Sequence, residues 1–121
     1  MSPLEVVQQW ETRAWTNADL TAVDDLIAEE IIRHGPSGTV VRSRAQIKDD
    51  LRQYQRALHK PTIIVNDRVV DGDKVWSRLT MRGVNLETGD KRTVGWLQIQ
   101  RVVDGLIVES WTLYASDIDW E

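Results

Sequence analysis

The sequence contains no cysteine, no phenylalanine and only two histidines, and it has no apolar run of membrane-spanning length. Without cysteine, disulfide bonds, thiolate nucleophiles and thiolate metal sites are excluded. The 15 Lys and Arg are outnumbered by 19 Asp and Glu, and no basic patch is concentrated to bind nucleic-acid phosphates. The first residues also lack a charged start followed by an apolar signal segment. We therefore expect a cytoplasmic protein with no nucleic-acid or membrane partner.

Motifs that hold cofactors are missing as well. There is no glycine-rich phosphate loop, no dinucleotide-binding fingerprint and no serine in a nucleophile elbow. His34 and His59 are separated by a predicted helix, and no spacing of two histidines with a carboxylate suits a metal ion. We therefore expect no metal and no cofactor, so that any chemistry would depend on the side chains of the chain itself.

What the chain does contain is enough apolar material for one core. Its 121 residues, 41% of them hydrophobic and 28% charged, predict a single domain over residues 1–121. Six tryptophans are unusual for this length. Because tryptophan combines a large apolar ring with a polar N–H group, we expect several of them to line the core or a cavity.

Helical signals occupy the first half of the chain. Serines at two expected helix starts can cap the first turn, and apolar residues recur at helical spacing behind them. The predicted helices run from Ser2 to about Asn17, from Asp19 to about Ile27, and from Ser43 to about residue 59. Residues 30–34 are β-like in composition, and residues 35–38 form a tight loop.

Strand signals occupy the second half. Residues 62–70, 74–86, 91–103 and 106–115 are rich in β-branched and aromatic side chains, with hairpin turn residues between them. Helices first and consecutive hairpins afterwards predict an α+β domain with an antiparallel meander.

The last hairpin decides which side chains share a face of the sheet. If Asp104-Gly105 is a two-residue turn, regular pairing places Gln100 opposite Glu109, Gln98 opposite Trp111, and Trp96 opposite Leu113. These six side chains would then share one face. A β-bulge would reverse the assignment from that point onward.

His34 is the first candidate for acid/base chemistry. An apolar run brings Arg33 and His34 to the point where Gly35 and Pro36 end the element. Imidazole titrates closest to neutral pH of all side chains, so modest burial or one carboxylate suffices to make it an acid or a base. The alternative is a histidine that only binds backbone carbonyls at the end of a strand.

Several sequence strings, taken in order, resemble a known superfamily. They are Asn17-Ala18-Asp19-Leu20, His34-Gly35-Pro36, residues 71–78, Gly83 and residues 101–111. Together they resemble the nuclear transport factor 2-like superfamily, and within it the SnoaL-like branch of small polyketide cyclases and related isomerases. The resemblance implies three N-terminal helices packed in a strongly curved antiparallel sheet, a cystatin-like cone or α+β barrel. It also implies a ligand cavity inside the cone and a homodimer interface on the outer face of the sheet.

The resemblance also suggests catalytic residues. His34 lies near the position of a general base in similar isomerases. That branch usually carries an acidic residue four positions beyond the tryptophan of the last strand, where this chain has Ala115. The carboxylate partner of His34 is therefore Glu109 or Asp117, and Gln98 is the candidate donor to an oxyanion.

Each of these residues has a simpler alternative. Glu109 can instead form an ion pair on the sheet with Arg78 or Arg101, and Gln98 can lie on a polar sheet face. The candidate substrate-binding residues are Trp76, Trp96 and Trp111 as flat walls, with Tyr54 and Arg78 as polar groups. The three tryptophans and Tyr54 could equally belong to the core, and Arg78 could face a dimer partner.

Three functions remain open. The first is a cofactor-independent acid/base enzyme, an isomerase, cyclase or dehydratase acting on a small cyclic or polyketide-like substrate. The second is a non-catalytic module that binds a small hydrophobic or aromatic ligand or serves assembly. The third is an epoxide hydrolase-like enzyme, which is weakened because Thr80 and Thr112 stand where similar hydrolases carry acids.

Overall fold

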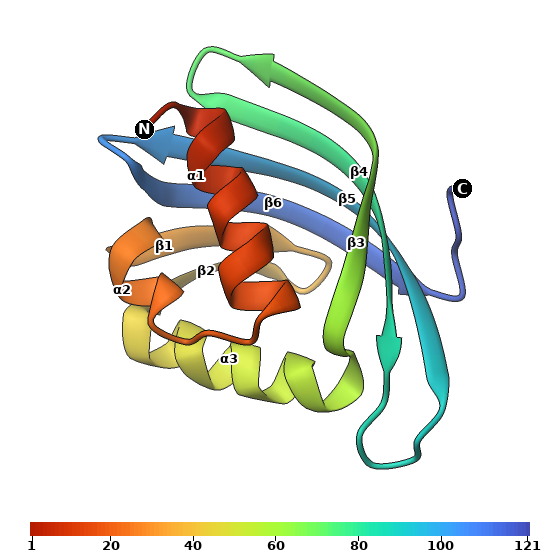
Figure 1. The fold of residues 1–121 in the computed structure, drawn as a ribbon. Coiled ribbons are helices and arrows are strands. Elements are labelled where there is room, and N and C mark those ends of the chain that lie inside the picture. The colour runs from red at the N-terminus through yellow and green to blue at the C-terminus, as the bar shows by residue number, and fades with distance from the viewer.

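A strongly curved sheet wraps around three helical segments in the computed structural model, which describes all residues 1–121 (Figure 1). In chain order the elements are α1 (Pro3–Trp10), the π-helix η1 (Glu11–Thr16), α2 (Ala22–Leu26), β1 (Ile27–Gly35), β2 (Gly38–Ser43), α3 (Arg44–Ala57), β3 (His59–Asp71), β4 (Lys74–Val84), β5 (Lys91–Val103) and β6 (Leu106–Ser116). This arrangement confirms the predicted α+β cone. No helix has the length and apolar character needed to cross a membrane.

The sheet has six strands in the order β2-β1-β6-β5-β4-β3. Strands β3 to β6 form the predicted antiparallel meander, whereas β1 runs parallel to β6. The helices lie on the concave side, with α1 crossing the sheet and α3 along one end of it (Figure 1). We call the side that faces the helices the inner face and the opposite side the outer face.

Helix boundaries follow local hydrogen bonding. Ser2 and Glu5 form a capping box at the start of α1, and Ser43 and Gln46 form another at the start of α3. Between the helices and the inner face lies a single core of 20 buried apolar residues. The most enclosed side chains in it include Val6, Val7, Val23, Leu26, Val75, Leu79, Met81 and Ile107.

One strand was not predicted. Residues 38–43 form β2, which pairs with β1 across a turn at Pro36 and Ser37. Gly38 was expected in a loop and Ser43 as a helix cap, and the residues between them had no predicted element. The four strands predicted after Pro61 are confirmed, with boundaries shifted by a few residues.

The predicted register of the last hairpin is wrong because of a β-bulge. Asp104 and Gly105 do form a two-residue turn, with φ values of 51° and 77°, and Val103 pairs with Leu106. Arg101, however, pairs with Glu109, so that Val108 is an extra residue in β6. The observed pairs beyond the bulge are Gln100 with Ser110, Gln98 with Thr112, and Trp96 with Tyr114.

The residues after β6 fold back onto the outer face, and we call residues 117–121 the C-terminal tail. The backbone N–H of Trp120 donates to Thr80 Oγ1 at 3.2 Å. Arg82 Nη2 pairs with Asp119 at 2.9 Å, and the guanidinium of Arg78 lies 5.6 Å from the centroid of the Trp120 ring. The tail therefore covers one end of the outer face.

Candidate functional site

The bulge at Val108 divides the predicted site residues between the two faces of the sheet. Beyond it, Ser110 and Thr112 lie on the inner face with Gln98 and Gln100. Glu109 lies on the outer face, together with Arg101, Ile99, Trp111 and Leu113. Glu109 and Gln98 were expected on one face, and the structure places them on opposite faces.

His34 lies on the outer face beside Glu109. On β1 the side chain of Ile31 is buried against the helices, Arg33 points to α3, and His34 stacks on Trp111 with ring centroids 5.0 Å apart. The Nε2 atom of His34 is 2.7 Å from Oε2 of Glu109, and its Nδ1 is 2.8 Å from Oγ1 of Thr39. The structure thus brings His34 and Glu109 together, but outside the space enclosed by the helices.

Glu109 has a second partner. Its Oε1 accepts a hydrogen bond from Nε of Arg101 at 3.1 Å, the sheet ion pair that was the alternative for this residue. The hydrogen bond from His34 and the interactions with Arg101 lower the pKa of Glu109 below its ordinary value. An ionised Glu109 with both oxygens engaged fixes the His34 ring in place.

An open groove adjoins this pair on the outer face, and we call it the outer groove. Its volume is about 650 Å³, and its lining includes His34, Trp76, Arg78, Leu97, Trp111 and Leu113. Trp76, Leu97 and Leu113 are 47%, 45% and 55% exposed. Predicted site residues Trp76, Trp111 and Arg78 therefore meet at an exposed apolar surface instead of an enclosed pocket.

Asp117 does not lie with His34 and Glu109. It lies in the turn after β6, where its backbone N–H donates to the carbonyl of Thr93 at the far end of the β5–β6 pair from Glu109. Ala115 pairs with Gly95 on the outer face, next to the C-terminal tail. An acidic residue at position 115 would therefore face away from the helices.

A second, smaller cavity of about 60 Å³ lies between the inner face and the helices, and we call it the inner cavity. Three predicted residues line it, namely Tyr54, Trp96 and Gln98. Its other lining residues include Trp10, Trp15, Ile31, Arg33, Asp50, Leu51, Gln100, Ser110 and Thr112. The inner cavity therefore combines tryptophan walls with several polar groups, as the sequence suggested for a ligand site.

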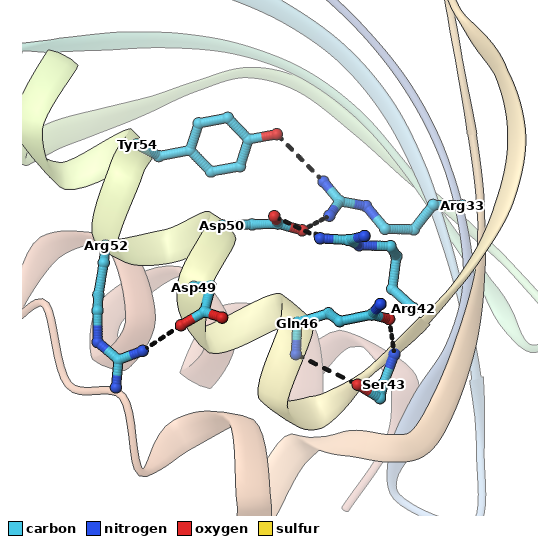
Figure 2. A network of polar contacts seen from close by, with 8 residues as sticks. All are labelled: Arg33, Arg42, Ser43, Gln46, Asp49, Asp50, Arg52 and Tyr54. Carbon is cyan, nitrogen blue, oxygen red and sulfur yellow. Dashed lines mark hydrogen bonds and ion pairs between the residues drawn. The ribbon is translucent and has the colours of Figure 1, made fainter.

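A charged cluster joins α3 to strands β1 and β2, and two of its residues, Arg33 and Asp50, line the inner cavity (Figure 2). Asp50 accepts hydrogen bonds from Arg33 Nη1 at 2.8 Å and from Arg42 Nη2 and Nε at 2.7 and 3.2 Å. The Nη2 of Arg33 also donates to the hydroxyl of Tyr54 at 3.4 Å. Arg33, Arg42 and Asp50 were not among the predicted site residues.

The sequence held a signal for two of them. Asp50 lies three residues after Ile47 and four before Tyr54, on the apolar face of α3, whereas Asp49 pairs with Arg52 in solvent (Figure 2). Arg33 has the same strand parity as the buried Ile31. Periodicity alone could thus have predicted that the side chains of Asp50 and Arg33 face the interior.

Trp96 has a buried polar atom without a partner. The ring packs edge-on against Trp15, with centroids 5.5 Å apart, and stacks on Tyr114 at 4.5 Å. Its Nε1 is buried and makes no hydrogen bond. A buried N–H group without an acceptor is costly, so a ligand oxygen that reached this atom would relieve the cost. No group of three or more His, Asp or Glu side chains is arranged to hold a metal ion.

Comparisons with known proteins give the fold a family. A model described as the SnoaL-like domain matches residues 7–110. IdmH, a proposed polyketide cyclase from Streptomyces antibioticus, is 26% identical with a TM-score of 0.80, the match covering 94% of this chain and 92% of that one. A proposed polyketide cyclase from Acidithiobacillus ferrooxidans has a TM-score of 0.82 at 16% identity, with 93% and 87% covered. AclR, a proposed hydroxylase from Streptomyces galilaeus, has a TM-score of 0.72 at 20% identity, with 94% and 76% covered. No curated protein matches the sequence.

Proposed function

Because the chain belongs to the SnoaL-like domain family, we propose that it binds a small cyclic carbonyl compound in the inner cavity and moves a proton next to the carbonyl group without a cofactor. Isomerisation, aldol-type cyclisation and dehydration can all pass through the enolate that this step forms. The observation that carries the proposal is that Tyr54, Gln98 and Trp96, whose buried Nε1 has no partner, all line the inner cavity.

These three groups can donate to a developing oxyanion. A hydroxyl, an amide and an indole N–H are neutral donors, and they act more strongly in a dry site than in water. Asp50 is the only carboxylate that lines the cavity, so it is the proton acceptor of this proposal. Arg33 and Arg42 hold its carboxylate in place through their hydrogen bonds.

The ligand must enlarge the cavity to enter. Its 60 Å³ is far below the roughly 300–1,000 Å³ of typical ligand pockets. Tyr54 is the side chain best placed to move, since its hydroxyl is held by one long bond of 3.4 Å to Arg33 and its ring is only partly buried against the core. We therefore propose that Tyr54 swings aside on binding and then returns its hydroxyl to the ligand.

Proton exchange tests this proposal without a known substrate. Small cyclic ketones such as 2-tetralone, incubated with the protein in D2O, report removal of an α-proton by loss of its NMR signal. We expect Asp50→Asn to lower the rate to that of buffer and Tyr54→Phe to lower it by roughly tenfold or more. Arg52→Gln, on the solvent side of the same helix, is the matched control and should exchange at the wild-type rate.

A second candidate site is favoured by the size of the outer groove. At about 650 Å³ it could hold a ring system between Trp76 and Trp111, with His34 as the base and Glu109 as its partner. The same assay separates the two sites. Exchange that survives Asp50→Asn and is lost in His34→Ala would contradict the inner site and assign the chemistry to the outer groove. Binding without exchange in any variant would favour the non-catalytic module.

We propose that the outer face is instead covered by a second copy of the chain. The apolar residues Trp76, Leu97 and Leu113 form a patch that also carries Asp67 and Arg78, one acid and one base. A two-fold interface requires such a self-complementary patch, because each residue meets the partner's copy of the same surface.

Cytoplasmic location also stays a prediction, supported by the lack of cysteine.

Sedimentation velocity tests the dimer. Leu97→Glu, in the middle of the patch, should yield a monomer because the interface would bury a charge without a partner. Leu86→Glu is the matched control, since Leu86 is as exposed but lies in the turn between β4 and β5. A monomeric wild-type chain would contradict the proposal.

A further inference from the structure

We propose that the ligand of the inner cavity carries a carboxylate, and that Arg33 binds this carboxylate at the mouth of the cavity. The inference rests on the proposed function, because it names the class of compound that the same cavity accepts. Its basis is the charge balance of the cluster formed by Arg33, Arg42 and Asp50 (Figure 2).

Two guanidinium groups share one carboxylate in this cluster. Arg42 binds Asp50 with two hydrogen bonds, one to each oxygen, in the fork geometry that neutralises a carboxylate most completely. Arg33 adds a single bond to Oδ2, which Arg42 already uses. The cluster therefore has a net charge of +1, and the uncompensated charge belongs to Arg33.

Arg33 also has donors to spare. A guanidinium has five N–H groups, and Arg33 uses one to reach Asp50 and one for the long bond to Tyr54. Among the residues that line the inner cavity, Arg33 and Asp50 are the only charged ones. No second carboxylate of the protein lines the cavity to occupy the remaining N–H groups.

The position of Arg33 suits an anionic group at the cavity mouth. Its side chain is 29% exposed and that of Asp50 is 19% exposed, so this end of the cavity reaches solvent. The deeper walls are Trp10, Trp15 and Trp96, all buried. A ligand with a carboxylate at one end and an apolar ring at the other would match this gradient, because its charge stays near water.

The unpartnered Nε1 of Trp96 adds an independent observation. Trp96 lines the same cavity, and a ligand that reached its buried N–H group would supply the missing acceptor with an oxygen, such as that of a ketone. The carboxylate at Arg33 and the ketone oxygen at Trp96 together define a cyclic or aromatic keto acid as the ligand class.

A matched pair of probes tests the carboxylate directly. We would titrate the protein with 4-oxo-4-phenylbutanoate and with its neutral amide by calorimetry, following the Trp96 indole signal by NMR to locate the binding site. The acid should bind at least about tenfold more tightly than the amide, the effect expected of charge-assisted hydrogen bonds. Raising the salt concentration should weaken only the acid, because the pair lies near the surface.

Variants assign the preference to Arg33. Arg33→Gln should bind acid and amide equally, and Arg33→Lys should keep part of the preference because it keeps the charge. Arg52→Gln, which changes an arginine outside the cavity, should behave as wild type. If Arg33→Gln does not fold, the lysine variant and the salt dependence still decide the question.

The outcomes separate the two proposals. Equal binding of acid and amide by the wild type would overturn the carboxylate inference and leave the proposed function intact. A preference that persists in a folded Arg33→Gln variant would overturn it too. If neither probe shifts the Trp96 signal or binds, the inner cavity is not the ligand site and both proposals fail.

Discussion

Gly95 is the point where the C-terminal tail touches the sheet, and replacing it with alanine gives a sharp test of the structure. A Cβ atom at this position would lie 2.6 Å from Cγ2 of Ile118 and 2.9 Å from Nε1 of Trp120. Both distances are shorter than van der Waals contact allows. Because strand β5 is fixed by neighbours on both sides, the tail must be the part that moves.

The stability lost in Gly95→Ala cannot exceed the free energy that the docked tail contributes to the fold. Ile118 and Trp120 are each 37% exposed, so their contacts with the sheet bury most of both side chains. Full burial of an apolar side chain is worth about 1.5–3 kcal/mol, which gives about 2–4 kcal/mol for the pair. Ordering the backbone of residues 118–121 costs about 1 kcal/mol each at the low end, and the exposed ion pairs of the tail add little. At the favourable end the two terms nearly balance, so docking of the tail stabilises the fold by less than about 1 kcal/mol.

Gly95→Ala should accordingly change the free energy of unfolding of the full chain by two opposite contributions that nearly cancel. Losing the docked tail costs less than about 1 kcal/mol, while alanine in a strand gains roughly 0.5–1 kcal/mol by restricting the unfolded chain. In a chain that stops at Ser116 only the gain remains, so the same substitution should be stabilising. Urea unfolding of the four proteins measures the difference, and backbone NMR relaxation should show residues 117–121 becoming mobile in Gly95→Ala.

Two results would refute this reasoning. A loss of more than about 3 kcal/mol in the full chain would mean that the strand yields instead of the tail, since the docking energy cannot supply so large a cost. Equal effects in the full and shortened chains would mean that the contact between Gly95 and the tail is absent in solution.

Two further predictions follow from the pKa directions. The pKa of Glu109 is lowered by its hydrogen bond from His34 and by Arg101, so its ionised form stabilises the fold above the ordinary value of 4.5, and this contribution is lost as the pH falls through the lowered value. Urea unfolding at a series of pH values should show Glu109→Gln with a flatter acid limb than wild type, and an unchanged limb would contradict the His34 contact. Burial raises the pKa of Glu11, opposed by its ion pair with Arg68, so protonation of Glu11 stabilises the fold below pH 4.5 and that contribution is lost as the pH rises through the raised value. Arg68→Met should therefore cost about 3–5 kcal/mol near neutral pH and less in acid, whereas the double variant with Glu11→Gln should recover most of the loss.

Local signals in the sequence were sufficient for most of the fold. The caps at Ser2 and Ser43 and the turn at Asp104 and Gly105 each act within a few residues, so they can be read directly. Strand β2 (Gly38–Ser43) was missed for a physical reason. Its first four side chains are exposed, so it lacks the buried alternation that marks a strand.

The candidate site was harder to predict from the sequence than the fold, because it depends on which face of the sheet each side chain occupies. Glu109, one of the two carboxylates offered as a partner of His34, does contact it, but the residue of β1 that lines the inner cavity is Arg33, the neighbour of His34. The grouping of Arg33, Arg42 and Asp50 joins residues 17 and 8 positions apart on three different elements. Contacts of that kind depend on tertiary packing, and no local sequence pattern predicts which residues will form them.

The bulge at Val108 determines which side chains of β6 face the inner cavity and which face outward. Without this one extra residue, β6 would present Glu109 and Trp111 to the inner cavity and turn Ser110 and Thr112 outward. A single-residue deletion could thus exchange a hydroxyl-lined site for one with a carboxylate and an indole while every side chain kept its identity. Two relatives with the same letters in an alignment can therefore have different sites, and the bulge must be matched before a catalytic role is transferred between them.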